Sequence, residues 1–190
     1  MIKAKENHMK IQKNETIYNG FYSFKKLTVE DKGKTFEREV FDIGSAAAAL
    51  VYNTATDKYI LVKQYRYGAG RALLEIVAGI VENEQGDPEK TIRKEIEEET
   101  GYETDHLEHI WDFYPSGGAS TEKLFLYYAE VSTKKAEGGG LDEEHEEIEV
   151  LEYSLDELLS LQLLDAKTII AVQWLAFKKG RSLNNPGAKI

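Results

Sequence analysis

Bulky and polar residues alternate along two stretches near the start of the chain, and this period of two is typical of half-buried β-strands. The stretches are Ile17–Val29 and Thr35–Phe41, and the turn residues between them predict a hairpin. Ala46–Tyr52 is apolar throughout, as in a strand that is buried on both faces. Tyr59–Tyr65 and Leu73–Val77 continue the strand pattern. The hairpin therefore precedes the first strands of a main domain.

Farther along the chain, helices interrupt the strands. Asp87 is a good N-cap, Pro88 suits the first helical position and Gly101 suits a left-handed C-cap, so a helix is predicted up to about Thr100. A helix between strands indicates an α/β (α+β) chain whose sheet is mixed rather than purely parallel. The remaining pattern predicts strands over Leu107–Phe113, Lys123–Val131 and Ile148–Tyr153, and helices over Leu155–Leu161 and Ala166–Lys179.

The first predicted helix carries three glutamates on or near its apolar face. If successive residues are separated by about 100° and Ile92 marks the apolar face, Glu99 lies at about −20°, Glu95 at about −60° and Glu98 at about −120°. The lysines and arginine of the helix fall on a different face of mixed charge. Glu99 is therefore expected beside the core, where an ionised carboxylate is costly without a positive partner.

Several environments would suit these carboxylates. A divalent cation prefers oxygen ligands, whereas an arginine such as Arg66 or Arg71 would also balance the charge. A run of charges on a helix is also commonly a solvated face. The spacing alone leaves a metal ion and an arginine partner as equal alternatives.

The composition of the chain excludes several kinds of partner and of catalytic group. The chain carries a net charge of −10 and has no cysteine. That charge disfavours nucleic acid as a partner, and the lack of cysteine excludes disulfides, thiolate metal sites and cysteine nucleophiles. No apolar run is long enough to span a membrane and no signal-peptide pattern is visible, so we expect no membrane partner and a cytoplasmic location. A phosphorylated substrate would need divalent cations between itself and the acidic groups.

The glutamate-rich helix and the residues before it resemble the signature motif of one protein family. Gly79–Glu82 and Asp87–Tyr102, with the run Lys94-Glu95-Ile96-Glu97-Glu98-Glu99-Thr100-Gly101-Tyr102, resemble the Nudix box, commonly written GX5EX7REUXEEXGU. Lys94 replaces the usual arginine, and one extra residue leaves Gln85 or Gly86 where the loop glutamate is expected, with Glu84 as a shifted substitute. The resemblance implies the Nudix fold, a mixed β-sheet sandwiched between helices, with an N-terminal β-hairpin extension.

Resemblance extends outside the box. The segments Gln64–Arg66, Glu75–Gly79, Tyr114–Glu122, Gly138–Gly140 and Asp165–Thr168 resemble the GDP-mannose pyrophosphatase branch, with the ADP-ribose pyrophosphatases as close relatives. That branch implies a homodimer whose N-terminal hairpin is shared or exchanged. We accordingly expect a flexible tail at residues 1–10, a strand or hairpin region for dimerisation at 11–45, and the Nudix hydrolase domain at 46–190.

Roles for single residues follow from the same resemblance. It implies Mg²⁺, or Mn²⁺ in its place, bound by Glu95, Glu99, Glu146 and the carbonyl of Ala78. Glu98 would be a further ligand or orient the water, and Glu146 would be a ligand or the general base, so the implied catalytic residues are Glu98, Glu99 and Glu146. The implied substrate contacts are Phe21, Arg38, Glu39, Arg66, Glu122 and Lys167. For the aromatic residues Phe21, Tyr22, Tyr65 and Tyr114, packing in the core is favoured over base stacking.

The implied substrate is a nucleotide sugar, whose diphosphate would be hydrolysed. GDP-mannose, giving GMP and mannose 1-phosphate, is favoured. ADP-ribose, giving AMP and ribose 5-phosphate, is the alternative within the enzyme class. A non-catalytic nucleotide-sugar sensor is the alternative from another class, because a fold does not fix a function.

Overall fold

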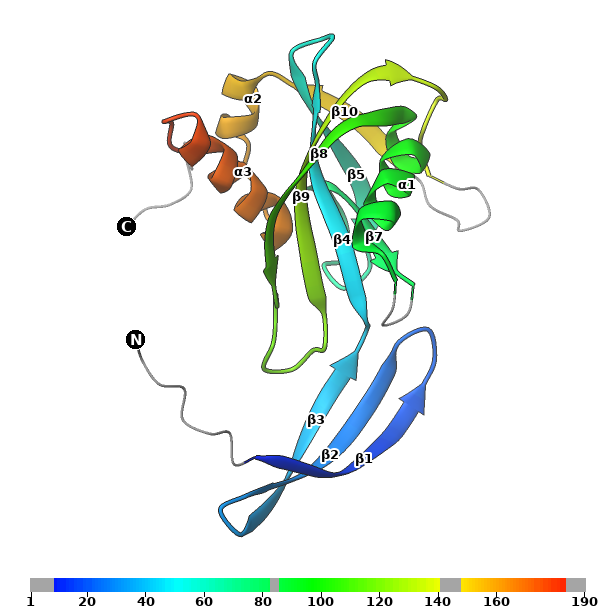
Figure 1. The fold of residues 1–190 in the computed structure, drawn as a ribbon, viewed down its shortest axis with the longest axis vertical. Coiled ribbons are helices and arrows are strands. Elements are labelled where there is room, and N and C mark those ends of the chain that lie inside the picture. Colours follow the sequence, from blue (N-terminus) through cyan, green and yellow to red (C-terminus); the bar gives the residue numbers. More distant parts are fainter. Residues whose placement is uncertain (1–8, 83–85, 141–147, 184–190) are drawn as a thin grey trace. The chain divides into compact units, whose positions relative to one another are not determined.

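The protein is described by a computed structural model that covers residues 9–82, 86–140 and 148–183. Its contacts divide the chain into two compact units (Figure 1). One unit contains the chain up to Gly44 together with Ser116–Glu122, and the other contains Ser45–Pro115 and the chain from Lys123 onward. Most of the predicted N-terminal tail, residues 1–8, lies outside the described residues.

The first unit is a three-stranded antiparallel sheet in the order β1-β2-β3. The strands are β1 (Lys10–Asn19), β2 (Ser23–Asp31) and β3 (Lys34–Asp42). The prediction of one strand over Ile17–Val29 was therefore wrong, because the chain turns at Gly20, whose amide donates to the carbonyl of Tyr22 at 3.1 Å. A Cβ atom at Gly20 would collide with the ring of Tyr18. The predicted hairpin is thus extended by a third strand.

The second unit contains a seven-stranded mixed sheet in the order β10-β5-β4-β9-β8, with β6 paired to β5 and β7 paired to β4. Strands β4 and β9 are parallel and the other pairs are antiparallel, which confirms the mixed sheet. The predicted strand Leu73–Val77 is in fact two strands that separate at Ile76. The strands are β4 (Ser45–Asn53), β5 (Lys58–Arg66), β6 (Arg71–Glu75), β7 (Val77–Val81), β8 (Tyr102–Phe113), β9 (Lys123–Lys134) and β10 (Glu149–Tyr153).

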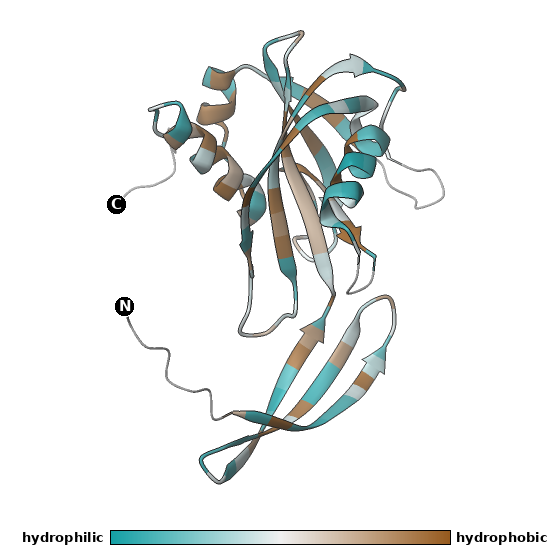
Figure 2. Cartoon of the chain, in the orientation of Figure 1, coloured by the Kyte–Doolittle hydropathy of each residue, from teal (hydrophilic) through white to brown (hydrophobic). Residues whose placement is uncertain are grey.

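Helices cover both faces of this sheet, as expected. They are α1 (Pro88–Thr100), α2 (Leu155–Ser160) and α3 (Ala166–Lys178). One buried cluster combines Ile92 and Ile96 of α1 with strand residues, and a second combines α2 and α3 with the other face. Each such side chain contributes about 1.5–3 kcal/mol when fully buried. Figure 2 shows that α1 is mostly hydrophilic while α3 carries broad apolar stretches. None of the described helices is long and apolar enough to cross a membrane.

The boundaries of α1 confirm the predicted caps. The Asp87 side chain accepts hydrogen bonds from the amides of Glu89 at 3.0 Å and Lys90 at 3.3 Å. At the other end Gly101 has a left-handed φ of 77° and its amide donates to the carbonyl of Glu97 at 2.9 Å. A Cβ atom at Gly101 would also collide with the carbonyl of Ala136, so glycine is required here for two independent reasons.

We predict that Gly101→Ala destabilises the protein more than Gly180→Ala. Both glycines end a helix with positive φ, but a Cβ atom at Gly180 would meet nothing within 4 Å. The left-handed backbone alone should cost Gly180→Ala about 1 kcal/mol, and the steric clash should cost Gly101→Ala about 1–3 kcal/mol more. Urea unfolding of the two variants measures the difference. Equal losses would contradict the packing of Ala136 on Gly101.

Candidate active site

The carboxylates of α1 differ in their surroundings as the helical angles predict. Glu99 is 6% exposed and shares the buried face with Ile92 and Ile96. Glu95 is half-buried. Glu98 is half-buried too, and forms an ion pair with Lys94 at 2.8 Å. The prediction that Glu99 lies against the core is confirmed.

Glu95 lies directly against strand β7. A Cβ atom placed on Gly79 would collide with the Glu95 carboxylate, so glycine at this position leaves the space that the carboxylate occupies. The residue before Gly79 is Ala78, the predicted carbonyl ligand. Carboxylate and main-chain carbonyl oxygens are the donors that Mg²⁺ and Mn²⁺ accept. The local arrangement therefore fits the predicted metal ion in its donor chemistry.

The predicted ligand set is only partly described. Within residues 9–82, 86–140 and 148–183, no three side chains of His, Cys, Asp or Glu converge in a way that could hold a metal ion. Glu146 lies in 141–147, and the loop candidates Glu84 and Gln85 lie in 83–85, so all three are outside the described residues. The described donors are consequently Glu95, Glu99 and the backbone of Ala78.

The glycine run 138–140 packs against the C-terminal end of α1. The amide of Gly139 donates to the carbonyl of Glu99 at 2.7 Å, and that of Gly140 donates to the carbonyl of Glu98 at 3.3 Å. Gly138 has a φ of 76°, and a Cβ atom there would crowd the same turn of helix. The acidic segment that contains Glu146 therefore follows a stretch of chain that is bound to the glutamate helix. Closure of this loop over a substrate stays a prediction.

Arg66 on β5 binds the buried carboxylate of Glu75 on β6. The guanidinium donates from Nε to Oε1 at 2.8 Å and from Nη2 to Oε2 at 2.9 Å. Glu75 is 1% exposed, and the ammonium of Lys167 forms a second ion pair with it. Sequence reasoning did not assign Glu75 a role. The available signal was a single glutamate in the middle of the predicted strand Leu73–Val77, whose other residues are apolar.

Charge balance keeps Glu75 ionised. Burial alone would raise the pKa of Glu75, but the hydrogen bonds from Arg66 and the positive charge of Lys167 outweigh it and lower the pKa below its ordinary value. The hydrogen bond to Glu75 raises the pKa of Arg66 against the opposing effect of burial, and the charges of Glu75 and Glu99 raise it further. Arg66 is thus paired with Glu75, and an arginine partner for Glu99 stays a prediction.

The first turn of α3 brings Lys167 to this group. Its ammonium also contacts Asp165 at 3.1 Å, and Asp165 caps the helix by accepting from the amide of Thr168 at 2.9 Å. The Thr168 hydroxyl accepts from the amide of Ile76 at 2.9 Å. The start of α3 is therefore fixed to the break between β6 and β7, two residues before Ala78.

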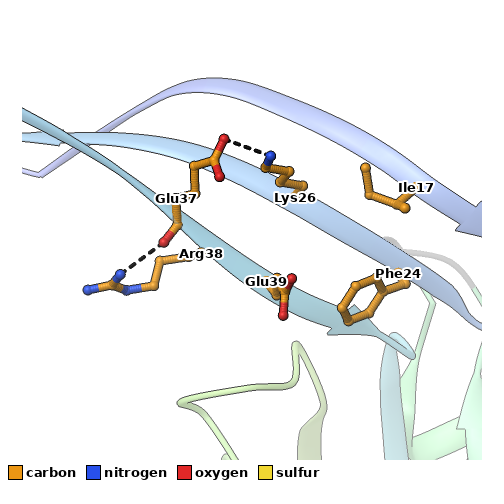
Figure 3. Close-up of a pocket in the computed structure, with 6 residues that line it drawn as sticks. All are labelled: Ile17, Phe24, Lys26, Glu37, Arg38 and Glu39. Atoms are coloured by element: carbon orange, nitrogen blue, oxygen red, sulfur yellow. Dashed lines mark hydrogen bonds and ion pairs between the residues drawn. The ribbon is translucent and has the colours of Figure 1, made fainter.

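Two predicted substrate contacts lie in the first unit, on β3. Arg38 and Glu39 line a groove of about 500 Å³ on the three-stranded sheet, shown in Figure 3 with its other lining residues. Arg38 donates to the carbonyl of Glu37 at 2.9 Å and its guanidinium lies over the ring of Phe36, 4.4 Å from the ring centroid. The side chain of Arg38 is thus oriented by its neighbours on the same strand.

The segment that ends in Glu122 is attached to the same strand. The amide of Phe41 donates to the carbonyl of Ala119 at 2.8 Å, and the hydroxyl of Thr121 donates to Asp42 at 2.6 Å. The hydrogen bond from Lys25, followed by that from Thr121, lowers the pKa of Asp42. Glu122 therefore belongs to the first unit with Phe21, Arg38 and Glu39.

The aromatic candidates are exposed rather than buried. Phe21 is 85% exposed and touches the edge of the Tyr22 ring, with 4.8 Å between centroids. Tyr22, Tyr65 and Tyr114 are exposed as well. The preference for core packing was wrong for these four residues, because they lie in turns and at strand ends, where their side chains are exposed. Their stacking on a base stays a prediction.

The fold and the glutamate helix agree with a known family. Residues 42–175 match the model of the NUDIX domain, and the chain therefore belongs to the NUDIX family. The matched range includes Glu75, Ala78, the whole of α1 and Lys167.

Several curated proteins are similar along nearly their whole length. A methanol dehydrogenase activator of Bacillus methanolicus is 37% identical over 175 residues, covering 88% of this chain and 92% of that protein. A GDP-mannose pyrophosphatase of Cronobacter sakazakii is 32% identical over 188 residues, covering 90% and 96%. One of Escherichia coli is 31% identical over 178 residues, covering 86% and 92%. These relatives confirm the predicted branch.

A solved structure supports the fold independently. The structure described as an ADP compounds hydrolase superposes with a TM-score of 0.74, covering 94% of this chain and 100% of that one, at 15% sequence identity. At so low an identity the likeness concerns the fold, and it confirms the Nudix architecture.

We predict that Gly79→Ala weakens Mn²⁺ binding without unfolding the protein. The new Cβ atom would displace the Glu95 carboxylate, and because a glutamate side chain can swing aside, the cost in stability should stay below about 1 kcal/mol. We expect the dissociation constant for Mn²⁺, measured by electron paramagnetic resonance, to rise about tenfold or more. The control is Gly68→Ala, whose Cβ atom would meet nothing within 4 Å. Unchanged Mn²⁺ affinity in Gly79→Ala would rule out Glu95 as a ligand at this strand.

Proposed function

We propose that this Nudix hydrolase is a Mg²⁺-dependent pyrophosphatase that cleaves the diphosphate of a nucleotide sugar. The observation that carries the proposal is the pair formed by buried Glu99 and by Glu95 against Gly79, inside a Nudix box next to Ala78. The Glu95 carboxylate lies against the strand residue that follows Ala78. GDP-mannose is the favoured substrate, since relatives that match this chain along nearly their whole length are named GDP-mannose pyrophosphatases.

The residues have distinct roles in this reaction. Glu95, Glu99 and the Ala78 carbonyl would hold the Mg²⁺, with Glu146 as the further predicted ligand. The bound metal ion supplies charge neutralisation at the diphosphate and acidifies a water molecule. Arg66 donates to a phosphate oxygen, for which a guanidinium is well suited. Glu146 or Glu98 accepts the proton of the water whose oxygen attacks phosphorus.

The hydrolysis forms one bond to phosphorus and breaks another. The new bond joins the water oxygen to one phosphorus atom, and the bond between that phosphorus and the bridging oxygen breaks. GDP-mannose then yields GMP and mannose 1-phosphate, and ADP-ribose would yield AMP and ribose 5-phosphate. Both reactions use the same site, so the base and the sugar are distinguished by contacts away from the metal. Arg38 is a further proposed phosphate contact, and Phe21, Glu39, Glu122 and Lys167 are the other proposed substrate contacts.

We also propose that the protein is a homodimer and is located in the cytoplasm. The first unit exposes large apolar side chains on β1 and its turns, among them Ile11, Ile17 and Phe21. Such a surface supports a homodimer that buries it. The complete lack of cysteine is compatible with a reducing cytoplasm. Gel filtration with light scattering tests the dimer directly.

A panel of nucleotide sugars distinguishes a GDP-mannose pyrophosphatase from an ADP-ribose pyrophosphatase and from a non-catalytic sensor. Each nucleotide sugar is incubated with the protein and Mg²⁺, and a phosphatase specific for terminal phosphates then releases inorganic phosphate from the products. Phosphate from GDP-mannose alone supports the favoured substrate, and phosphate from ADP-ribose alone supports the alternative. If no substrate yields phosphate while one still binds in calorimetry, the protein is a nucleotide-sugar sensor and the proposal is wrong.

We predict that Glu99→Gln lowers kcat on the preferred substrate by roughly 10³-fold, because loss of a charged ligand removes transition-state stabilisation worth several kcal/mol. The amide keeps the size of the side chain in its buried position. Glu97→Gln is the matched control, since Glu97 lies on the exposed face of the same helix and should keep kcat within about twofold of the native value. Full activity in Glu99→Gln would exclude Glu99 as a metal ligand.

A further inference from the structure

Glu75 occupies an unusual place for a carboxylate. It ends strand β6 with 1% of its surface exposed, opposite Val62 of β5 in the strand register. Side chains of a strand alternate between faces, so Arg66 points to the same side of β5 as Val62. Val62 packs in the cluster that contains Ile92 and Ile96 of α1. Glu75 and Arg66 therefore lie on the face of the sheet that carries the glutamate helix.

The contact uses only one edge of the guanidinium. Nε and Nη2 of Arg66 each donate to a different oxygen of Glu75. Among the described residues, Nη1 makes no hydrogen bond, and 40% of the Arg66 side chain is exposed. A guanidinium has five N–H donors in one plane and can bind a second anion along another edge. Arg66 is thus fixed in orientation and still has donors available.

Lys167 is engaged differently. Its ammonium contacts two carboxylates, those of Glu75 and Asp165, and its side chain is 14% exposed. A second cation on Glu75 keeps this buried carboxylate ionised, because burial alone opposes its charge. Of the two cations that contact Glu75, Arg66 therefore presents the freer donors to a ligand, and Lys167 supports the carboxylate that orients it.

The backbone beside Glu75 is also fixed. The amide of Ile76 donates to the hydroxyl of Thr168 at 2.9 Å, and that hydroxyl donates to Asp165 at 2.6 Å. The carboxylate is therefore restrained by its own two cations and by the chain that follows it. A side chain with so little freedom can hold a flexible arginine in one geometry, which lowers the entropy lost when a ligand binds.

We propose that Glu75 is a positioning residue for the diphosphate: it binds the Nε–Nη2 edge of Arg66 so that the Nη1 edge receives a phosphate oxygen. Lys167 completes the arrangement by neutralising Glu75 from the start of α3. The inference rests on the proposed function in that the ligand is a diphosphate. The competing explanation is that the buried ion pairs only join β6 to α3 and contribute to folding.

A double-mutant cycle tests whether Glu75 acts through Arg66. Affinity for inorganic pyrophosphate with Mg²⁺ is measured by calorimetry for the native protein, Glu75→Gln, Arg66→Met and the double variant. If Glu75 orients Arg66, Glu75→Gln should weaken binding about tenfold in the native background and less than about twofold when Arg66 is already absent. Equal weakening in both backgrounds, or none in the native one, overturns the inference.

Controls separate positioning from folding. The thermal unfolding of each variant is measured together with its affinity for pyrophosphate, because loss of a buried charge is expected to lower stability. Glu108→Gln is the matched control, since Glu108 also accepts from a lysine of α3, Lys178, but at an exposed site; it should bind pyrophosphate with native affinity. If Glu75→Gln fails to fold, Glu75→Asp takes its place in the cycle, because it keeps the charge but cannot reach Arg66 in the same geometry.

Kinetics on the preferred nucleotide sugar distinguish this inference from the proposed function. A positioning defect should raise KM more than it lowers kcat, because the contact forms when the diphosphate binds. If the native protein hydrolyses no nucleotide sugar but the pyrophosphate cycle behaves as expected, the proposed function fails and the role of Glu75 stands. If the native protein does not bind pyrophosphate, the role of Glu75 is wrong.

Discussion

Carboxylates buried against the core are the constraint on which the rest of the site depends. Glu99 and Glu75 are both buried, and an ionised group in such a place needs compensating charge or hydrogen bonds. Arg66 and Lys167 supply that charge at Glu75, and the charge of Glu99 also acts on Arg66. Strand β6, helix α1 and the start of α3 are therefore linked by electrostatics as well as by packing. Any metal ion bound at Glu95 and Glu99 would enter a site whose surrounding charges are already arranged.

Much of the fold follows from local sequence signals. Asp87, Pro88 and Gly101 predicted both ends of α1, and the period of 3.6 predicted that Glu99 faces the core. The breaks at Gly20 and Ile76 were missed for different reasons. Asn19-Gly20 is a common turn pair, but the strand-like alternation continues on both sides of it and hides the turn. The run Leu73–Val77 does not reveal a break at Ile76, whose amide donates to the hydroxyl of the distant Thr168.

The candidate site was less predictable than the fold. The motif located Glu95, Glu98, Glu99 and Ala78 because they are close in sequence. Glu75 and Lys167 are 92 residues apart, and their contact depends on the register of β6 and the approach of α3. The exposure of Phe21 and Tyr65 is likewise a property of the folded chain that the alternation of bulky and polar residues does not give. Such features arise from tertiary packing, which a period of hydrophobicity along the chain does not encode.

Arg66 binds Glu75 with one edge of its guanidinium and is proposed to bind the ligand with another, and this limits which residues can replace it. A lysine could supply the same charge at that position, but an ammonium is a point charge and has no second planar edge to offer once it is paired. The positions of Arg66 on β5 and Glu75 on β6 are therefore coupled. A substitution at either position changes how much the other residue contributes to ligand binding. Among diverging copies of this gene, we expect arginine and glutamate here to be gained or lost together, whereas neighbouring positions on the same strands vary independently.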